Sequence, residues 1–252
     1  MSTRQPALIA NALRIKMRLD SSMVDRGLAN SRSQAENIIK LGQVKVDGKL
    51  TKKPSKPVKL NTKIELTSNQ HYVSRAAFKL ASVVKAFDLD FRGKTVLDVG
   101  SSTGGFTEFA INHGATKVIA VEVGTNQLHP RLRNNPKIEL HEQTDIRNFS
   151  TNQSVDIVLI DVSFISLQDI LPTVRLFANK NTSIVAMVKP QFEAFKSDTK
   201  HKGVIKNEKI RRDILKNFEQ WAKQHFFIKN KADSSVAGAK GNIERFYLLI
   251  KL

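Results

Sequence analysis

Lysines and carboxylates stand at the edges of several predicted elements of this chain. Asp161 follows one apolar run, Lys189 follows the next, Lys79 lies on a predicted helix, and Glu244 begins the last predicted strand. A lysine directly after an apolar strand is costly without a partner, and Asp161 is well placed to be that partner. A purely structural ion pair is the competing interpretation. Two lysines and two carboxylates around one site indicate metal-free proton chemistry on an alcohol.

A glycine-rich turn lies between Lys79 and Asp161, after a predicted strand at 95–99. It consists of Gly100, Ser101, Ser102, Thr103, Gly104, Gly105 and Phe106. Glycines let a backbone approach a ligand closely, and such sheets bind ligands at the carboxyl ends of their strands. A dinucleotide fingerprint would need glycine in place of Ser102, and a phosphate-binding loop would need a following Gly-Lys-Ser/Thr. An ordinary tight turn is the plain alternative.

Two further carboxylates follow the neighbouring predicted strands. Glu122 can bind both hydroxyls of a ribose, and Asp145 can accept a hydrogen bond from an exocyclic amine. Each alone is more often a helix cap or a surface charge, but together at successive strand ends they indicate a nucleoside site. The six histidines are scattered, none at paired ligand spacing, so no metal site is predicted.

These residues need a scaffold in which strands and helices alternate. Apolar runs predict strands at 95–99, 117–123, 138–141, 155–160, 183–188, 226–231 and 245–251, and helices at 75–86, 105–113, 167–177 and 207–225. Continuous apolar strands separated by helices are typical of a parallel sheet covered on both faces. The last two strands indicate a late antiparallel addition. The predicted fold class is α/β.

Length and charge indicate a second, basic unit. A chain of 252 residues favours two domains. The net charge is +18, and residues 1–70 hold 14 basic and 5 acidic side chains, or +9. Such charge favours a polyanionic partner, RNA or DNA, over an inert charged surface. The absence of cysteine excludes disulfides and thiol nucleophiles. No apolar run of eighteen residues predicts a membrane span, and without a convincing signal peptide the expected location is the cytoplasm.

The basic unit is predicted to span residues 1–67. Short helices are expected at 23–28, ended at Gly27, and after Ser31, followed by a strand turned at Asp47-Gly48 and another at 62–66. The basic side chains Arg18, Arg26, Arg32 and Lys45 are predicted to contact phosphates, which position an RNA without reading its sequence. An ordinary solvated face is the alternative.

Two sets of motifs resemble known families. Arg18-Leu-Asp20, Gly27-Leu28, Ser31-Arg32, Gly42-Gln-Val44 and Val46-Asp-Gly48 resemble the S4 RNA-binding domain. Ser74-Arg75, Lys79-Leu80, the turn from Asp98 to Phe106, Asp161 to Leu167, Lys189 to Glu193, Lys202-Gly203 and Gly241 to Glu244 resemble the TlyA family. That family joins an S4 domain to an FtsJ-like methyltransferase.

The resemblance implies a Rossmann-like class I methyltransferase domain at 75–252, reached through a linker at 68–74. It also implies S-adenosylmethionine as the cofactor and ribosomal RNA or ribosomal subunits as partners, with no metal and no membrane. The reaction would methylate a ribose 2′-OH, on cytidine. The family's cofactor contacts fall on the glycine turn, Glu122, Asp145 and Asp161. Departures are Ala76-Ala77 in place of two glycines, Glu122 in place of aspartate, and Arg245 in place of an aromatic residue.

The family's catalytic tetrad falls on Lys79, Asp161, Lys189 and Glu244. In the expected mechanism Lys189 accepts the 2′-OH proton, Asp161 orients it, and Lys79 and Glu244 hold the lysine and the hydroxyl in line. A non-catalytic RNA-binding assembly factor is the first alternative, although all four tetrad residues are present. A membrane-active haemolysin, a label attached to the family, is disfavoured because no spanning segment is visible.

Overall fold

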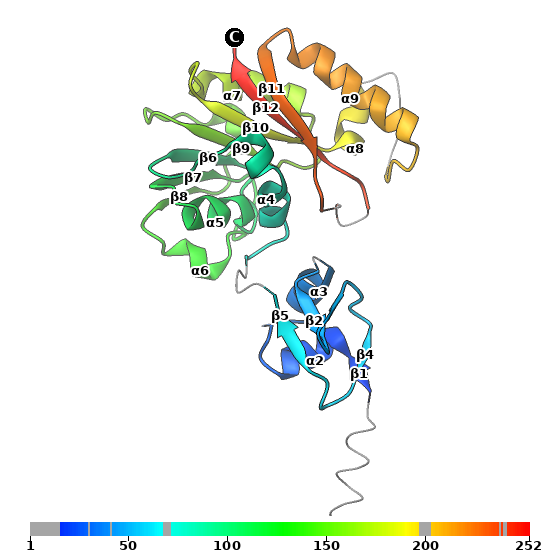
Figure 1. The fold of residues 1–252 in the computed structure, drawn as a ribbon. Coiled ribbons are helices and arrows are strands. Elements are labelled where there is room, and N and C mark those ends of the chain that lie inside the picture. Colours follow the sequence, from blue (N-terminus) through cyan, green and yellow to red (C-terminus); the bar gives the residue numbers. More distant parts are fainter. Residues whose placement is uncertain are drawn as a thin grey trace, which may run out of the picture. The chain divides into compact units, whose positions relative to one another are not determined.

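The computed structural model describes residues 16–29, 31–40, 42–67, 72–196, 203–236, 238 and 241–252, without the side chains of Ser33 and Asn37. The chain divides into two compact units, Met1–His71 and Tyr72–Leu252 (Figure 1). Each unit has its own hydrophobic core. Residues 68–71 of the expected linker, and Lys202 of the quoted motifs, lie outside the described residues.

The first unit packs two helices against small strands. Its elements are β1 (Met17–Arg18), α2 (Leu19–Asp25), α3 (Arg32–Lys40), β2 (Val44–Val46), β3 (Lys49–Thr51), β4 (Pro57–Val58) and β5 (Ile64–Leu66). The strands β3, β2 and β5 form an antiparallel sheet in that order, and β1 pairs with β4. This arrangement confirms the two helices and the hairpin turned at Asp47-Gly48.

Helix α2 begins four residues earlier than the sequence indicates. No side chain caps it. Instead the amides of Leu19 and Asp20 donate to the carbonyls of Lys56 (2.9 Å) and Pro54 (3.1 Å). The first amides of a helix need such acceptors, and here a distant loop provides them. No local sequence signal marks this start.

The second unit is built on a sheet of seven strands. They are β6 (Thr95–Val99), β7 (Lys117–Val121), β8 (Ile138–His141), β9 (Ile157–Ile160), β10 (Ser183–Val188), β11 (Phe226–Asp233) and β12 (Arg245–Lys251). Their order is β11-β12-β10-β9-β6-β7-β8. All pairs are parallel except those of β12, which runs antiparallel to both β10 and β11. The predicted parallel sheet with a late antiparallel addition is confirmed.

Helices cover both faces of this sheet (Figure 1). They are α4 (Ala76–Phe87), α5 (Gly105–Asn112), α6 (Pro130–Arg133), α7 (Leu167–Phe177), α8 (Pro190–Glu193) and α9 (Glu208–Ala222), with 3-10 turns η1 (Ile146–Asn148) and η2 (Ala194–Lys196). Apolar side chains of α4 and α5 join one core, and those of α7 and α9 join the other. Alternate residues of the inner strands supply the two cores, as Val96 and Leu97 of β6 do.

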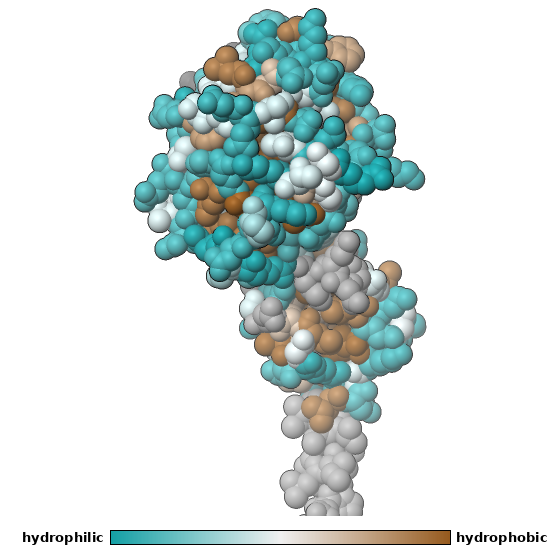
Figure 2. Space-filling view, turned by 90° about the vertical axis from the view of Figure 1, so that its left-hand side faces the viewer, coloured by the Kyte–Doolittle hydropathy of each residue, from teal (hydrophilic) through white to brown (hydrophobic). Residues whose placement is uncertain are grey.

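One face of the molecule can be compared by hydropathy. On the face drawn in Figure 2, hydrophilic residues surround smaller hydrophobic patches. Among the described residues, the most exposed large apolar side chain is that of Phe164, at 91%. A large aromatic residue so fully in solvent is a candidate contact for a ligand or a partner.

Candidate active site

The strand directions bring distant residues to one edge of the sheet. Parallel strands β6, β9 and β10 all end at that edge, and the antiparallel β12 begins there. The last paired residues of β10 and β12 are Val188 and Arg245. Lys189 and Glu244 are the next residues on each side, so continuing the ladder sets them opposite each other. A parallel last strand would place Glu244 at the far edge.

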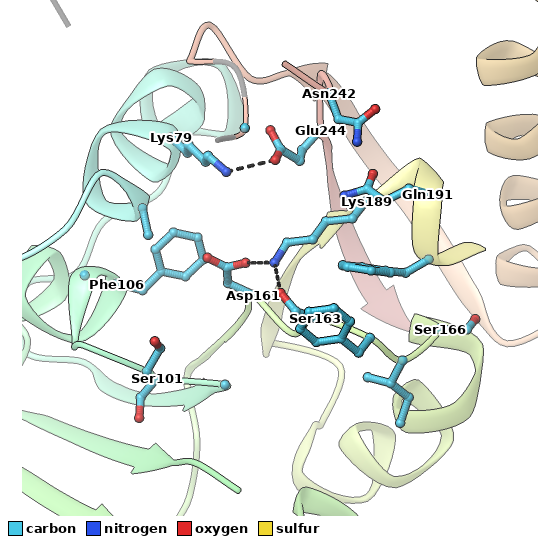
Figure 3. Close-up of a pocket in the computed structure, with 18 of the residues that line it drawn as sticks. Lys79, Ser101, Phe106, Asp161, Ser163, Ser166, Lys189, Gln191, Asn242 and Glu244 are labelled. Atoms are coloured by element: carbon cyan, nitrogen blue, oxygen red, sulfur yellow. Dashed lines mark hydrogen bonds and ion pairs between the residues drawn. The ribbon is translucent and has the colours of Figure 1, made fainter. Parts of the chain in front are cut away.

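The four predicted catalytic residues form two ion pairs around one cavity (Figure 3). Nζ of Lys79 lies 2.9 Å from Oε1 of Glu244, and Nζ of Lys189 lies 2.7 Å from Oδ1 of Asp161. These side chains are between 4% and 17% exposed. Nζ of Lys189 also donates to Oγ of Ser163 at 2.7 Å. Each buried lysine therefore has the partner that its burial requires.

The cavity has a volume of about 950 Å³. All four residues of the two pairs line it. So do most residues of the glycine turn, namely Gly100, Ser101, Ser102, Thr103, Gly105 and Phe106. Gly104 faces elsewhere, because a Cβ there would overlap the side chains of Leu128 and Leu132. The reactive side chains and the predicted cofactor turn thus share one space.

Close packing explains the glycine at position 100. Its φ is +79°, in the left-handed region that favours glycine. A Cβ at Gly100 would lie 2.9 Å from the carbonyl oxygen of Asp161. A side chain there would push the glycine turn away from the strand end that carries Asp161. The turn and the reactive carboxylate are therefore held in direct contact.

Glu122 and Asp145 both line a smaller cavity, of about 370 Å³, beside the glycine turn. The carboxylate of Glu122 accepts from the backbone amides of Ser102 (2.9 Å) and Gly124 (2.8 Å). Asp145 pairs with Arg147 at 2.6 Å and caps η1. That pairing holds the pKa of Asp145 below its usual range, chiefly through the hydrogen bonds from the Arg147 side chain. Glu122 thus braces the turn, whereas Asp145 is already engaged by a neighbour.

A carboxylate that the sequence argument did not single out also faces the larger cavity. Asp98 is fully buried; its Oδ2 accepts from the hydroxyl of Thr107 at 2.6 Å. Its Oδ1, like Oγ of Ser101, has no hydrogen-bond partner among the described residues. Burial raises the pKa of Asp98 to about 7, and the nearby charges of Asp161 and Glu122 add to this effect. The sequence did offer a signal for this role, because Asp98 is a charged residue inside the apolar strand β6.

These features fit a nucleoside-bearing cofactor with a cationic centre. Buried polar atoms without partners are uncommon in folded proteins, and Oδ1 of Asp98 and Oγ of Ser101 are among those whose residues line the cavity here. The charges of Asp161 and Glu122 contribute to the raised pKa of Asp98, and this concentration of negative charge would favour a cation nearby. The glycine turn leaves room for close backbone approach.

Two aromatic side chains stand at the cavity beside the reactive lysine. The rings of Phe164 and Phe192 lie 5.1 Å apart, and both residues line the cavity. Phe164 has a φ of +67°, unusual for a bulky residue. Strained backbone of this kind clusters at functional sites. Its position three residues after Asp161 was visible in the sequence, but its exposure was not.

The carboxylate of Glu244 lies close to a glycine. A Cβ on Gly238 would overlap Oε1 of Glu244. The Gly238 amide donates to the carbonyl of Asn242 at 2.8 Å, and the Asn242 side chain accepts from the amide of Ile205 at 2.9 Å. Gly238 and Asn242 also line the cavity. Neither was predicted as a site residue, since loop residues acquire such roles only through the tertiary structure.

The four basic residues predicted to bind RNA differ in their surroundings. Arg18 and Arg32 both pair with the buried Asp20, at 2.5 and 3.2 Å, while their own side chains are 43% and 56% exposed. The hydrogen bond from Arg18 lowers the pKa of Asp20 to about 2. Arg26 donates to the carbonyls of Lys59, Leu60 and Thr62. Lys45 is exposed on β2. Asp20 thus presents two arginines to solvent, whereas Arg26 braces a loop.

No group of three or more histidine or acidic side chains suited to holding a metal ion occurs among the described residues. No helix in the described part of the chain is long and apolar enough to cross a membrane.

Family models match both units. The model for the FtsJ-like methyltransferase matches residues 72–251, and the model for the S4 domain matches residues 17–64.

Similar proteins cover most of the chain. The 16S/23S rRNA (cytidine-2′-O)-methyltransferase TlyA of Mycobacterium tuberculosis strain CDC 1551 is 37% identical over 240 residues, covering 93% of this chain and 90% of the relative. The 23S rRNA (cytidine-2′-O)-methyltransferase TlyA of Campylobacter jejuni is 42% identical over 191 residues, covering 75% of this chain and 74% of that one. A solved structure from Streptococcus thermophilus that carries a hemolysin name matches with a TM-score of 0.67 and 33% identity, covering 94% of this chain and 88% of that one.

Proposed function

The chain belongs to the FtsJ-like methyltransferase family, and on this premise we propose that it methylates the 2′-hydroxyl of a cytidine ribose in ribosomal RNA, using S-adenosylmethionine. The observation that carries the proposal is the pairing of Lys189 with Asp161 and of Lys79 with Glu244 around one cavity beside the glycine turn. The names of the two rRNA methyltransferases described above support the choice of substrate.

The cofactor would lie along the glycine turn and extend into the smaller cavity. S-adenosylmethionine supplies an electrophilic methyl group on a cationic sulfonium. Glu122 would accept from ribose hydroxyls; its place in the lining of the smaller cavity, which Asp145 shares, supports this role. The carboxylate of Asp161 would provide the negative charge that a cation needs in a buried site, and the unpartnered Oδ1 of Asp98 would be available to accept a hydrogen bond.

The four residues Lys79, Asp161, Lys189 and Glu244 would then remove the 2′-OH proton. During methyl transfer to the ribose oxygen, the 2′-OH proton would pass to Nζ of Lys189 and later to solvent; Lys189 would enter this step as the neutral amine, having first released one proton to solvent. Asp161 and Ser163 fix the position of Nζ. Glu244 follows the last residue pair of β10 and β12, opposite Lys189. Together with Lys79 it would hold the hydroxyl in line for attack on the methyl group. Correct placement supplies much of the rate in such an attack.

The RNA would be held by both units. The basic S4 unit supplies sequence-independent phosphate contacts. At the cavity, the exposed ring of Phe164 offers a face on which the target base can stack. A nucleotide turned outward from its helix would need such a platform.

Methyl mapping on ribosomal subunits tests the proposal. Small and large subunits from cells lacking this protein would be incubated separately with the purified protein and S-adenosylmethionine carrying a labelled methyl group. Label is expected on a cytidine 2′-oxygen, in EDTA as well as in magnesium, because the tetrad itself supplies the proton acceptor. Label on a base, or no transfer despite calorimetric binding of the cofactor, would contradict the proposal. Lys189→Ala is the matched inactive control.

A further inference from the structure

One charged residue lies on the buried face of helix α9. That face carries Ile214, Leu215 and Phe218, which are at most 1% exposed. Arg211 lies one turn earlier on the same face and is only 7% exposed. Burying a guanidinium costs several kcal/mol, on the order of the loss of a core side chain, unless it is paired and hydrogen-bonded. Its contacts therefore show what the charge is used for.

Arg211 reaches the loop between β11 and β12. Its NH2 group donates to Oδ1 of Asp233 at 2.6 Å, and its Nε donates to the carbonyl of Ile243 at 3.2 Å. Arg245 donates to both oxygens of the same aspartate, at 2.7 and 3.1 Å. Burial alone would raise the pKa of Asp233, but hydrogen bonds from Arg245 and Arg211 outweigh it and hold that pKa below its usual range. We call Arg211, Asp233 and Arg245 the Arg211 clamp.

The clamp grips the residues on both sides of Glu244. Ile243 is held through its carbonyl, and Arg245 is held through its side chain opposite Asp233, the final register pair of β11 and β12. Glu244 itself accepts from the amide of Ser234 at 2.9 Å through its backbone carbonyl. Its side chain, by contrast, has Oε1 on Lys79 and no partner for Oε2 among the described residues. The clamp therefore holds the backbone around Glu244, whereas Lys79 holds one oxygen of its carboxylate.

We propose that the Arg211 clamp is the positioning device for Glu244, and that Arg211 acts in methyl transfer only through that carboxylate. The inference rests on the proposed function, because it assigns a purpose to the placement of Glu244. The chemistry requires such support: a catalytic group displaced by about 1 Å can lose on the order of a hundredfold in rate. A plain structural ion pair would instead affect stability alone.

The first test compares Arg211→Met with Arg212→Met in the full-length protein. Methionine keeps an unbranched apolar stem at position 211 and removes the charge, and Arg212 is the exposed neighbour on α9. Arg211→Met is expected to lower kcat about tenfold or more, with the KM for RNA and the calorimetric Kd for S-adenosylmethionine within about twofold of wild type. Arg212→Met should match wild type in kcat. An unchanged kcat in a folded Arg211→Met protein overturns the inference.

The second test is a double-mutant cycle with Glu244→Gln. If Arg211 acts only through Glu244, adding Arg211→Met to Glu244→Gln should cause no further loss of kcat. A full additional loss would show that Arg211 acts by another route and would overturn the inference. If Arg211→Met fails to fold, Asp233→Asn replaces it, because Asp233 is 40% exposed and tolerates the neutral isostere better.

Hydrogen exchange tests the clamp without using activity. The Ser234 amide, which donates to the Glu244 carbonyl, is expected to exchange about tenfold faster in Arg211→Met and at the wild-type rate in Arg212→Met. Unchanged exchange in Arg211→Met overturns the inference whatever its turnover. A wild-type protein that binds the cofactor yet transfers no methyl group would contradict the proposed function, and the exchange measurement would still decide on the clamp.

Discussion

At the scale of residues, Lys189 carries the sharpest prediction. It is held by Asp161 and Ser163, so Lys189→Arg should keep the positive charge and the pairing. A guanidinium cannot give up its proton at working pH, so both Lys189→Arg and Lys189→Ala should lose about a hundredfold or more in kcat. Cofactor affinity should change little. Labelled-methyl incorporation, a cofactor titration and a thermal melt together check this. Near-wild-type turnover of Lys189→Arg would make Lys189 a fixed positive charge.

Asp98 gives a prediction about pH. Its pKa is raised from the model-peptide range to about 7, chiefly by burial. The folded protein therefore holds a proton that the unfolded chain releases near pH 4, and this stabilisation is lost as pH rises toward 7. The stability advantage of Asp98→Asn over wild type should grow between pH 4 and 8, by on the order of 4 kcal/mol at most. Parallel urea titrations at several pH values measure it. A constant difference would show that Asp98 is ionised throughout.

Residue type and position predicted part of the site. The lysines and carboxylates at strand ends could be found because a charge beside an apolar run needs a reason. Phe164, Gly238 and Asn242 could not, because their roles depend on exposure and on loop contacts that only the folded chain has. The partners of the lysines were predicted only in part: pairing of Lys189 with Asp161 was expected, whereas no partner was predicted for Lys79, which pairs with Glu244.

At the scale of elements, the loop between β11 and β12 must approach Glu244 closely. Gly238→Ala is predicted to displace that carboxylate, because the added methyl group would overlap Oε1. We expect kcat to fall about tenfold while the free energy of unfolding changes by about 1 kcal/mol or less. Turnover and urea unfolding of the same preparation check the two expectations. A variant with full turnover would show that Glu244 can shift without loss.

The bounds of several strands were predicted correctly because residues within and beside each strand determine them. Strands at 95–99, 138–141, 183–188 and 245–251 are observed as predicted, because apolar runs bounded by polar residues fix them. The start of α2 was wrong because carbonyls of a distant loop cap it. The pairing of β12 between β10 and β11 could not be read from either strand alone, although this pairing sets Glu244 opposite Lys189.

At the scale of the whole molecule, the basic side chains of the S4 unit are predicted to bind RNA, whereas the lysines of the other unit serve the reaction. Arg32→Gln and Lys45→Gln should each weaken RNA affinity and reduce the slope of log K against log salt by about one, because each contact neutralises one phosphate. Arg26→Gln is the matched comparison. It removes the same charge but also frees three loop carbonyls, so it should lower the melting temperature more than the other two. Equal salt slopes for wild type and Arg32→Gln would remove Arg32 from the RNA contact. Filter binding over a salt series measures the affinities and slopes, and thermal melts measure the stabilities.

The position of β12, one strand in from the edge of the sheet, has a consequence for how the protein folds. This strand follows β11 in sequence but lies between β10 and β11 in the sheet, so β11 cannot dock before β12 arrives. Until then β10 presents an open edge, which is a hazard for association with other chains. The same late, long-range pairing delivers Glu244 to Lys189. A molecule that is competent for methyl transfer is therefore one in which β12 has paired with β10. Partially folded chains that lack this pairing should be both prone to aggregation and inactive.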